Sequence, residues 1–187
     1  MATRNILKDG ERGLNKKSRE VTDFNDRLHI LLDDMRETLI TANGLGLAAP
    51  QVGVLRRAAL IVDTSLETEL PEDATDEEVY EQIDKQIIEL INPEILKTDG
   101  EQTGSEGCLS VPGVYGLVTR PETVTVKAQD RNGKVFELKV SEIAARAVCH
   151  EIDHLEGIIF TSVAERILSE EELAEMAAQK EENEEIL

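Results

Sequence analysis

Aromatic residues make up only 3% of the 187-residue chain, and tryptophan is absent. A hydrophobic core must therefore be built from leucine, isoleucine, valine and alanine side chains. Basic residues are also scarce, since 20 lysines and arginines face 39 aspartates and glutamates, which gives a formal net charge of −19. Nucleic-acid binders need a cationic surface to displace the counterions of phosphate, so neither nucleic acid nor an anionic membrane is an expected partner.

Long apolar runs and a set of paired cysteines are missing as well. No hydrophobic stretch approaches the roughly 18 residues of a membrane span, and the start of the chain lacks the apolar region of a signal peptide. The two cysteines, Cys108 and Cys149, are too few for a disulfide framework in a chain of this length. The expected location is the cytoplasm, where both thiols stay reduced.

Hydrophobic periodicity predicts two amphipathic helices. Apolar residues recur at intervals of three and four over residues 24–42, and an Asn-Gly pair directly afterwards ends that pattern. A second helix is expected over residues 142–156, whose apolar residues give it a wide buried face. The capping candidates are Thr22 or Asp23 for the first helix, and Ser141 and Gly157 for the second.

Four segments have the composition of strands. Residues 58–63 form an apolar run, and residues 89–96 are strand-like, with a proline that indicates an edge or a bulge. Residues 123–128 and 135–140 alternate between apolar and polar residues, and an Asn-Gly pair between them favours a tight hairpin. Since most of these strands are connected without a long helix, antiparallel pairing is expected.

Two acidic segments differ from the rest of the chain. Residues 65–86 carry nine acidic residues against one lysine and are expected to form a solvated, partly helical surface loop. A third helix with a frayed end is expected from about residue 165, where Ser169 and Glu172 form a capping-box pattern.

The strongest chemical signal is the sequence HEIDH at residues 150–154, inside the second predicted helix. Residues four apart lie on one face of a helix, so two imidazoles can bind one divalent ion. Glu151 would then lie beside the ion, where it can accept a proton from water. The chain has only three histidines, and the remaining one, His29, is expected to be a solvated side chain.

A catalytic metal site usually has three protein ligands, so a third must come from elsewhere in the chain. Cys108 is one candidate, because it lies in a short element bounded by glycine and a thiolate binds a cation readily. The carboxylates of the C-terminal segment, such as Glu172 or Glu175, are the others. Cys149 points about 100° away from the first histidine around the helix and is expected to be a buried structural residue.

Three motifs occur in order along the chain, namely GLGLAAPQ at residues 44–51, EGCLS at residues 106–110 and HEIDH at residues 150–154. Together they closely resemble the three motifs of the peptide deformylases. The flanking sequences at residues 92–93, 110–113 and 155–157 are also similar to that family. The resemblance covers the chain from about residue 22 to residue 165.

This resemblance implies a metal-dependent hydrolase that removes the N-formyl group from the N-terminal methionine of newly synthesised polypeptides and releases formate. It implies an α+β fold in which antiparallel sheets pack around a central metal-binding HExxH helix, with an N-terminal helix and a C-terminal helix. Residues 1–165 would form the catalytic domain, with an acidic insertion at about 65–86. Residues 166–187 would form an acidic C-terminal helix or tail.

By the same resemblance, Cys108, His150 and His154 hold one divalent metal ion. Ferrous iron is the usual ion of the family, and Zn²⁺, Ni²⁺ or Co²⁺ can substitute, whereas sulfur and nitrogen ligands alone would favour zinc. Glu151 is the expected general base. The side chain of Gln51 and the backbone N–H of Leu109 are expected to stabilise the oxyanion.

The expected substrate is an N-formylmethionyl peptide of a nascent chain. Its backbone would pair with the loop and strand that carry the first two motifs, and its methionine side chain would enter an apolar pocket beside the helix. Arg120 is expected to contact the peptide further along. In some bacterial members a basic C-terminal helix docks on the ribosome, a mode that the acidic tail opposes. The residues expected to bind substrate are Leu45, Gly46, Gly107, Arg146 and Ala147.

Two alternatives compete with this interpretation. An ordinary zinc endopeptidase would take its third ligand from the C-terminal segment, at Glu172 or Glu175, and would leave the motif at residues 44–51 without a role. A protein that binds formyl peptides or metal without turnover is the non-enzymatic alternative, and the presence of Glu151 and Gln51 argues against it.

Overall fold

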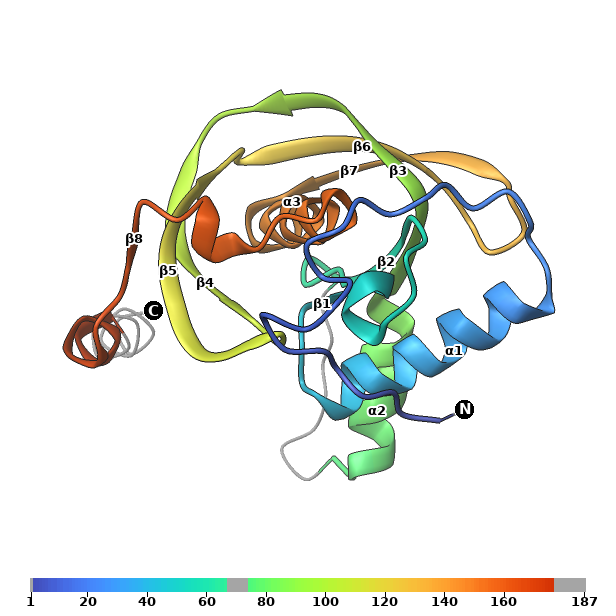
Figure 1. Ribbon diagram of the computed structural model, residues 1–187, viewed down its shortest axis with the longest axis horizontal. Coiled ribbons are helices and arrows are strands. Elements are labelled where there is room, and N and C mark those ends of the chain that lie inside the picture. The colour runs from blue at the N-terminus through green and yellow to red at the C-terminus, as the bar shows by residue number, and fades with distance from the viewer. Residues whose placement is uncertain (1, 67–73, 177–187) are drawn as a thin grey trace.

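The computed structural model describes residues 2–66 and 74–176 as an α+β fold with antiparallel sheets. One sheet has five strands in the order β1-β2-β3-β6-β7, and the other has three in the order β4-β5-β8. Strands of both sheets enclose α3 (Glu142–Glu156), which contacts β1, β2, β6 and β7 of the first sheet and β5 of the second (Figure 1). The predicted α+β fold with antiparallel sheets is confirmed. The strands are β1 Gly46–Ala48, β2 Ala58–Val62, β3 Ile87–Asp99, β4 Gln102–Cys108, β5 Val111–Arg120, β6 Thr123–Gln129, β7 Val135–Ser141 and β8 Arg166–Ile167.

The predicted bounds of α3 are confirmed at both ends. Gly157 follows the helix with a φ of +80° and donates its N–H to the carbonyl of His154. A Cβ atom at this position would also lie 2.8 Å from the backbone of Asn15 and Lys16, so glycine is required there on two grounds. Ser141 occupies the N-cap position, but its side chain makes no capping hydrogen bond.

α1 (Asp26–Thr41) begins slightly later than the sequence pattern predicts. Its N-cap is Asn25, whose side chain accepts hydrogen bonds from the N–H groups of Arg27 and Leu28, so the predicted caps at Thr22 or Asp23 are wrong. Asparagine satisfies the free N–H groups of the first turn as well as the predicted residues would. The helix packs its leucines and one methionine into the core beneath β1 and β2.

A bulge interrupts β3 at the Asn92-Pro93 pair. The register with β6 shifts between Ile91 and Glu94, and Asn92 has a φ of +51°. The side chain of Asn92 exchanges two hydrogen bonds with the backbone of Val21, at 2.8 and 2.9 Å, and so ties the N-terminal segment to the sheet. The bulge that the proline indicated is therefore present.

The hairpin of β6 and β7 turns through a loop of three residues rather than the tight pair that the Asn-Gly dipeptide favoured. Gly133 adopts a φ of +81° and donates its N–H to the carbonyl of Asp130, whose own N–H donates to Lys134. The strand ladder ends at Gln129 and Val135, and the bond between Asp130 and Lys134 extends the pairing by one residue on each side, which leaves residues 131–133 as the loop. This is the three-residue type of hairpin, in which a glycine in the left-handed conformation closes a type I turn.

The two acidic segments are partly helical. α2 (Asp76–Gln86) begins at a capping box formed by Thr75 and Glu78, and none of its residues is buried. It is attached to α1 by the ion pair of Arg36 with Asp84 and by a hydrogen bond from Tyr80. At the C-terminal end, residues 170–176 are helical.

The C-terminal helix starts later than predicted because β8 comes first and pairs with β5. Ser169 and Glu172 form the predicted capping box, with Glu172 N donating to Ser169 Oγ at 3.2 Å. The predicted frayed end lies outside the described residues. None of the helices in the described ranges is long and apolar enough to cross a membrane.

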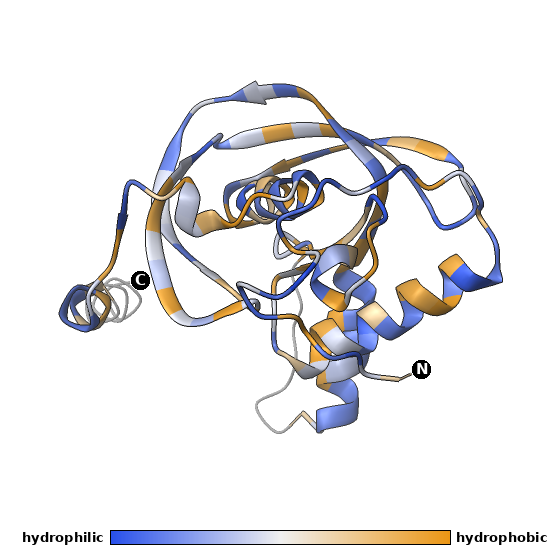
Figure 2. Ribbon diagram, in the orientation of Figure 1, coloured by the Kyte–Doolittle hydropathy of each residue, from blue (hydrophilic) through white to orange (hydrophobic). Residues whose placement is uncertain are grey.

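The core is aliphatic, as the shortage of aromatic residues requires. One cluster lies between α1, β1 and β2, and a second packs α3 against the first sheet. Buried and less buried positions alternate along β6, and Figure 2 shows hydrophobic and hydrophilic bands along the strands that curve over α3. A third cluster, which includes Leu14 and Phe160, joins the N-terminal segment to the second sheet. These clusters fix the positions of the elements that carry the candidate site.

Candidate functional site

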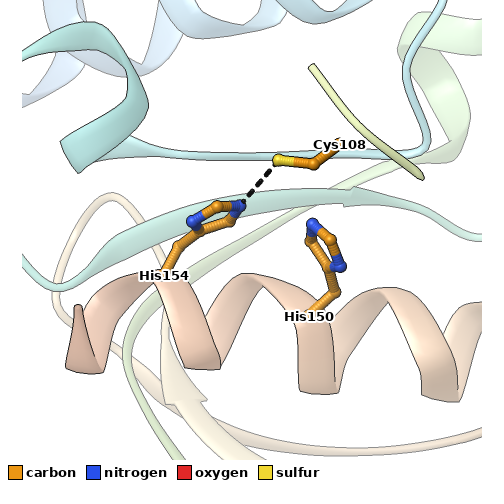
Figure 3. A group of neighbouring side chains, drawn as sticks. All are labelled: Cys108, His150 and His154. Atoms are coloured by element: carbon orange, nitrogen blue, oxygen red, sulfur yellow. Dashed lines mark hydrogen bonds between the residues drawn. The ribbon is translucent and has the colours of Figure 1, made fainter. Parts of the chain in front are cut away.

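A sulfur atom and two imidazoles meet at one point of the structure. Cys108 lies at the end of β4, and His150 and His154 lie on α3, with one ligand atom from each within 4.8 Å of the others (Figure 3). Cys108 Sγ is 3.2 Å from His154 Nε2. The structure therefore brings together the three residues that the sequence placed in a metal site, from segments more than 40 positions apart.

The local backbone explains why each group points inward. The two histidines are four residues apart and so share the face of α3 that turns toward β4. The register of β4 with β5 shifts between Gly107 and Cys108, where the hairpin turns back. In that turn the N–H of Ser110 donates to Cys108 Sγ at 3.4 Å, which orients the sulfur.

Glu106 forms a hydrogen bond with the imidazole of His150. Its Oε2 lies 3.0 Å from His150 Nδ1, so Nδ1 is the donor and Nε2 is the nitrogen left for a ligand. Burial opposes the charge of Glu106, but hydrogen bonds from His150 and Arg120 outweigh it and lower the pKa of this carboxyl to about 2. The carboxylate therefore stays ionised and fixes the orientation of the ring.

Sequence reasoning gave Glu106 no role of its own, although a signal was present. The EGC motif placed this carboxylate two positions before a candidate metal ligand. The register of β4 is irregular between Gly107 and Cys108, so strand alternation alone does not put the two side chains on one face. The contact between Glu106 and His150 depends on how β4 packs against α3.

Glu151 is buried against the backbone of β1. Its side chain is 3% exposed, and a Cβ atom added to Gly46 would overlap its carboxylate. Burial raises the pKa of Glu151 to about 7, close to the value at which a carboxyl group both accepts and returns a proton at neutral pH. Only glycine at position 46 lets the strand approach the carboxylate so closely.

Two buried polar atoms at this point have no hydrogen-bond partner among the described residues, namely Glu151 Oε2 and His154 Nδ1. Burial lowers the pKa of His154 to about 3, so its imidazole is neutral, which is the form that binds metal. The thiol and the two imidazoles place one ligand atom each within 4.8 Å of the others, a donor set that fits a divalent transition metal ion.

Gln51 and Leu109 both lie beside the cysteine and line the cleft. Gln51 is buried in η1 (Ala49–Val52), and its Oε1 accepts from the N–H of Ala48 at 2.7 Å. This bond leaves the NH₂ group to point at the sulfur and at Ser110, with Nε2 3.6 Å from Cys108 Sγ and 3.3 Å from Ser110 Oγ. Leu109 follows the cysteine directly and is half-buried at the edge of the same site.

A cleft of about 620 Å³ opens beside these residues. It lies between β1 and β4, each of which is the edge strand of its sheet. Leu45, Tyr115 and Ile143 expose apolar surface along it. The five residues expected to bind substrate, Leu45, Gly46, Gly107, Arg146 and Ala147, all line this cleft.

The two arginines expected near the substrate are engaged elsewhere. Arg146 lines the cleft, but its guanidinium donates to Glu106 at 3.0 Å and to the carbonyl oxygens of Val118 and Gln102. Arg120 is held by Glu106 and by Asp153, at 2.9 and 2.7 Å, and does not line the cleft. The sequence could not reveal this, because the pairing depends on how β4, β5 and α3 pack.

The other reactive side chains lie apart from the site. Cys149 is buried in the core beneath the first sheet, as expected, and burial raises the pKa of its thiol to about 11. His29 is not simply solvated, because its Nε2 lies 2.8 Å from the carbonyl oxygen of Arg131. Glu172, a candidate ligand in the endopeptidase interpretation, pairs with Arg166 and caps the C-terminal helix.

Comparison with known proteins agrees with the geometry. The sequence model of the polypeptide deformylase family matches residues 3–170. A peptide deformylase of Caldicellulosiruptor bescii is 49% identical over 173 residues, covering 92% of this chain and 92% of that protein. One of Lachnoclostridium phytofermentans is 50% identical over 160 residues, covering 86% of this chain and 88% of that protein. The crystal structure of a peptide deformylase from Legionella pneumophila aligns with a TM-score of 0.74 and 38% identity, over 96% of this chain and 92% of that one. The chain belongs to the polypeptide deformylase family.

Proposed function

We propose that this chain is a metal-dependent hydrolase that removes the N-formyl group from the N-terminal methionine of nascent polypeptides and releases formate. The observation that carries the proposal is the convergence of Cys108, His150 and His154 beside the buried carboxylate of Glu151. Membership of the deformylase family identifies the bond that such a site would hydrolyse.

Cys108 Sγ and the Nε2 atoms of His150 and His154 would hold one divalent ion on the central helix α3. The sulfur and nitrogen donors and the neutral His154 support this assignment. A divalent ion bound there supplies Lewis acidity, which lowers the pKa of water and polarises a carbonyl oxygen. We propose ferrous iron, the usual ion of the family, with Zn²⁺, Ni²⁺ or Co²⁺ able to replace it.

Glu151 is the proposed general base. Its carboxylate is buried, free of hydrogen bonds to the described residues at Oε2, and has its pKa raised toward neutrality. It can therefore take a proton from the attacking water and deliver it to the amine that leaves as the amide bond breaks. The close approach of Gly46 keeps the carboxylate fixed while this occurs.

Gln51 and Leu109 would stabilise the oxyanion that forms from the formyl oxygen. The bond from Ala48 to Gln51 Oε1 fixes the amide, so its NH₂ group faces the site as a donor. The backbone N–H of Leu109 is the second proposed donor. Fixed donors aimed at the developing charge stabilise the transition state more than the substrate.

The substrate peptide is proposed to lie between the two sheet edges. Leu45 and Gly46 on one side and Gly107 on the other offer edge backbone for an extended chain, which is the β-augmentation mode of peptide binding. Ala147, with the ring face of His150 and the exposed side chain of Leu45, would line the methionine pocket. Arg146 would shape its rim through its fixed guanidinium rather than as a free cation.

The proposed substrate is made at the ribosome, so we propose that the protein acts in the cytoplasm. We also propose that residues 1–165 form the catalytic unit and that residues 166–187 are an acidic appendage. Ribosome docking through a basic helix is disfavoured, because residues 166–187 carry far more acidic than basic side chains.

Release of formate from formyl-Met-Ala tests the function directly. The protein is purified and assayed without oxygen, after loading with Fe²⁺ or Co²⁺, beside the Glu151→Gln variant loaded in the same way. We expect the wild type to release formate and the variant to lose activity by about 10³-fold while its metal content stays the same. Absence of formate from the metal-loaded wild type, or near-full turnover by the variant, would contradict the proposal.

The endopeptidase alternative is tested with the same protein. That interpretation needs a ligand from the C-terminal segment, but Glu172 is occupied by Arg166 and by the cap of its own helix. The Glu172→Ala variant should therefore keep its metal, whereas Cys108→Ser should weaken metal binding. The opposite pattern of metal contents would favour the endopeptidase.

A further inference from the structure

Residues 7–9 run along the candidate site, where Lys8 lines the cleft, and bond to both loops that carry site residues. We call this segment the strap. The N–H of Leu7 donates to the carbonyl of Gln51 at 2.8 Å, and the N–H of Asp9 donates to the carbonyl of Ser110 at 2.9 Å. Between them, the ammonium of Lys8 donates to the carbonyl of Leu109 at 2.9 Å. Three consecutive residues thus connect the loops that carry the proposed oxyanion donors and the cysteine.

The strap is fixed in place by contacts of its own, which hold its hydrogen-bonding groups toward the two loops. The side chain of Leu7 packs in the cluster that contains Leu14 and one side of Cys108. The backbone N–H of Lys8 donates to Glu11 Oε2 at 2.5 Å, and the N–H of Glu11 donates back to the carbonyl of Lys8 at 2.9 Å. The main chain of Lys8 is therefore fixed, and its side chain has a defined route to Leu109.

The peptide unit that Lys8 contacts is the one that also contacts the sulfur. The carbonyl of Leu109 and the N–H of Ser110 belong to the same amide, and that N–H donates to Cys108 Sγ at 3.4 Å. A cation on the carbonyl oxygen draws electron density from the amide and makes its N–H a stronger donor. Hydrogen bonds to a ligand sulfur in turn change its donor strength toward a metal.

We propose that Lys8 is a positioning residue that tunes the electron density on Cys108 through the Leu109–Ser110 peptide. The proposal rests on the assignment of Cys108 as a metal ligand under the proposed function. Lys8 also lines the cleft, but its ammonium bonds to the carbonyl of Leu109 and to none of the other described residues, so the proposed effect on the sulfur passes through this amide. Lys8 is an exposed residue, and the bond from its ammonium to the Leu109 carbonyl is what distinguishes it from the other exposed lysines of the N-terminal segment.

The absorption spectrum of the Co²⁺-loaded protein tests this directly. A sulfur that accepts a weaker hydrogen bond is richer in electrons, so its charge-transfer band to Co²⁺ moves to longer wavelength. We expect this shift in Lys8→Met and expect Lys8→Arg, which keeps a cationic donor, to restore the wild-type spectrum. The matched control is Lys16→Met, because Lys16 is also an exposed lysine of the N-terminal segment and its ammonium bonds to none of the described residues.

Two further measurements separate this proposal from the proposed function. In the metal-free protein, Lys8→Met should speed hydrogen exchange at the Ser110 amide, and Lys16→Met should not. With formyl-Met-Ala, Lys8→Met should lower kcat by about tenfold with little change in KM, because tuning of a ligand alters chemistry rather than binding.

The outcomes are distinct. If the wild type releases no formate but the spectrum and exchange of Lys8→Met still differ from the control, the proposed function fails and the role of Lys8 stands. If Lys8→Met matches wild type and Lys16→Met in both the cobalt spectrum and the exchange rate of Ser110, the role of Lys8 is overturned, whatever the activity. Failure of Lys8→Arg to restore the spectrum would also contradict it.

Discussion

Glu106 is a single residue on which several parts of the site depend. It is 5% exposed and accepts hydrogen bonds from His150, Arg120 and Arg146. These three hydrogen bonds offset the free-energy cost of burying the carboxylate. Each arginine also bonds to a second acceptor, Arg120 to Asp153 and Arg146 to the carbonyl of Val118. The group therefore links the stability of the fold to the orientation of a proposed metal ligand.

Replacing Glu106 with glutamine should affect both properties. The variant keeps the shape of the side chain but leaves two buried guanidinium groups without their shared anion, so we expect the free energy of unfolding to fall by about 3 kcal/mol. The ring of His150 loses its charged acceptor, so the affinity for Co²⁺ should fall by about tenfold to a hundredfold. Urea unfolding and metal titration measure the two effects.

The matched control is Glu94→Gln. Glu94 also pairs with a cation, Lys127, but its side chain is 65% exposed and its ion pair is 3.4 Å long. Such a pair contributes less than about 1 kcal/mol. Equal effects of the two substitutions on metal affinity would show that Glu106 has no special relation to His150.

At the level of single residues, the sequence was informative where chemistry is local and uninformative where it depends on packing. The spacing of His150 and His154 on a helix could be read directly, and the structure places both beside Cys108. The engagement of Arg146 and Arg120 by a common carboxylate could not be read, because it joins three elements whose arrangement no local pattern specifies.

At the level of elements, the helices were more predictable than the strands. The spacing of apolar residues at three and four positions continues over several turns of α1 and α3, and Gly157 marks the end of α3. β4 has the sequence QTGSEGC, which lacks β-branched apolar residues and contains two glycines, so neither alternation nor propensity indicated a strand. Its pairing with β5 and the approach of Arg146 above Gly104 explain the composition, since a larger residue there would crowd the guanidinium.

The end of α3 is fastened to the rest of the fold by Glu156. This carboxylate pairs with Lys17 of the N-terminal segment at 2.6 Å and with Arg57, the residue that precedes β2. The hydrogen bond from Lys17 lowers the pKa of Glu156, and that from Arg57 adds to the effect. A carboxyl group with a lowered pKa contributes stability above its unfolded value of about 4.5, and that contribution is lost as the pH falls through the folded pKa.

Glu156→Gln should therefore destabilise the protein in a pH-dependent way. The side chain is about a third exposed, which screens the pair, so we expect a loss of about 1 kcal/mol at pH 7. The difference from wild type should shrink as the pH is lowered below about 4.5, because the wild-type carboxyl then becomes neutral as well. Urea unfolding across this range measures it, with Glu137→Gln, an exposed carboxyl on β7, as the control. A difference that is constant with pH would refute the electrostatic explanation.

At the scale of the whole molecule, the two acidic segments lie apart from the candidate site. The residues that line the cleft come from segments between positions 6 and 151, and neither α2 nor the helical residues 170–176 contribute one. The acidic helix α2 buries none of its residues, and the helical residues 170–176 lie beyond the last strand. The net charge of −19 is thus carried largely on surfaces that the proposed reaction does not use.

A variant that ends at residue 169 should keep the activity of the full chain. It retains β8 and its pairing with β5, and it removes none of the residues that line the cleft. We expect kcat/KM for formyl-Met-Ala to stay within about twofold, since surface changes away from buried features usually alter stability by less than about 0.5 kcal/mol. Association with ribosomes, measured by co-sedimentation, should be unchanged or stronger, because the deleted segment is acidic and repels RNA. Loss of ribosome binding in this variant would instead show that the acidic segment is a docking element.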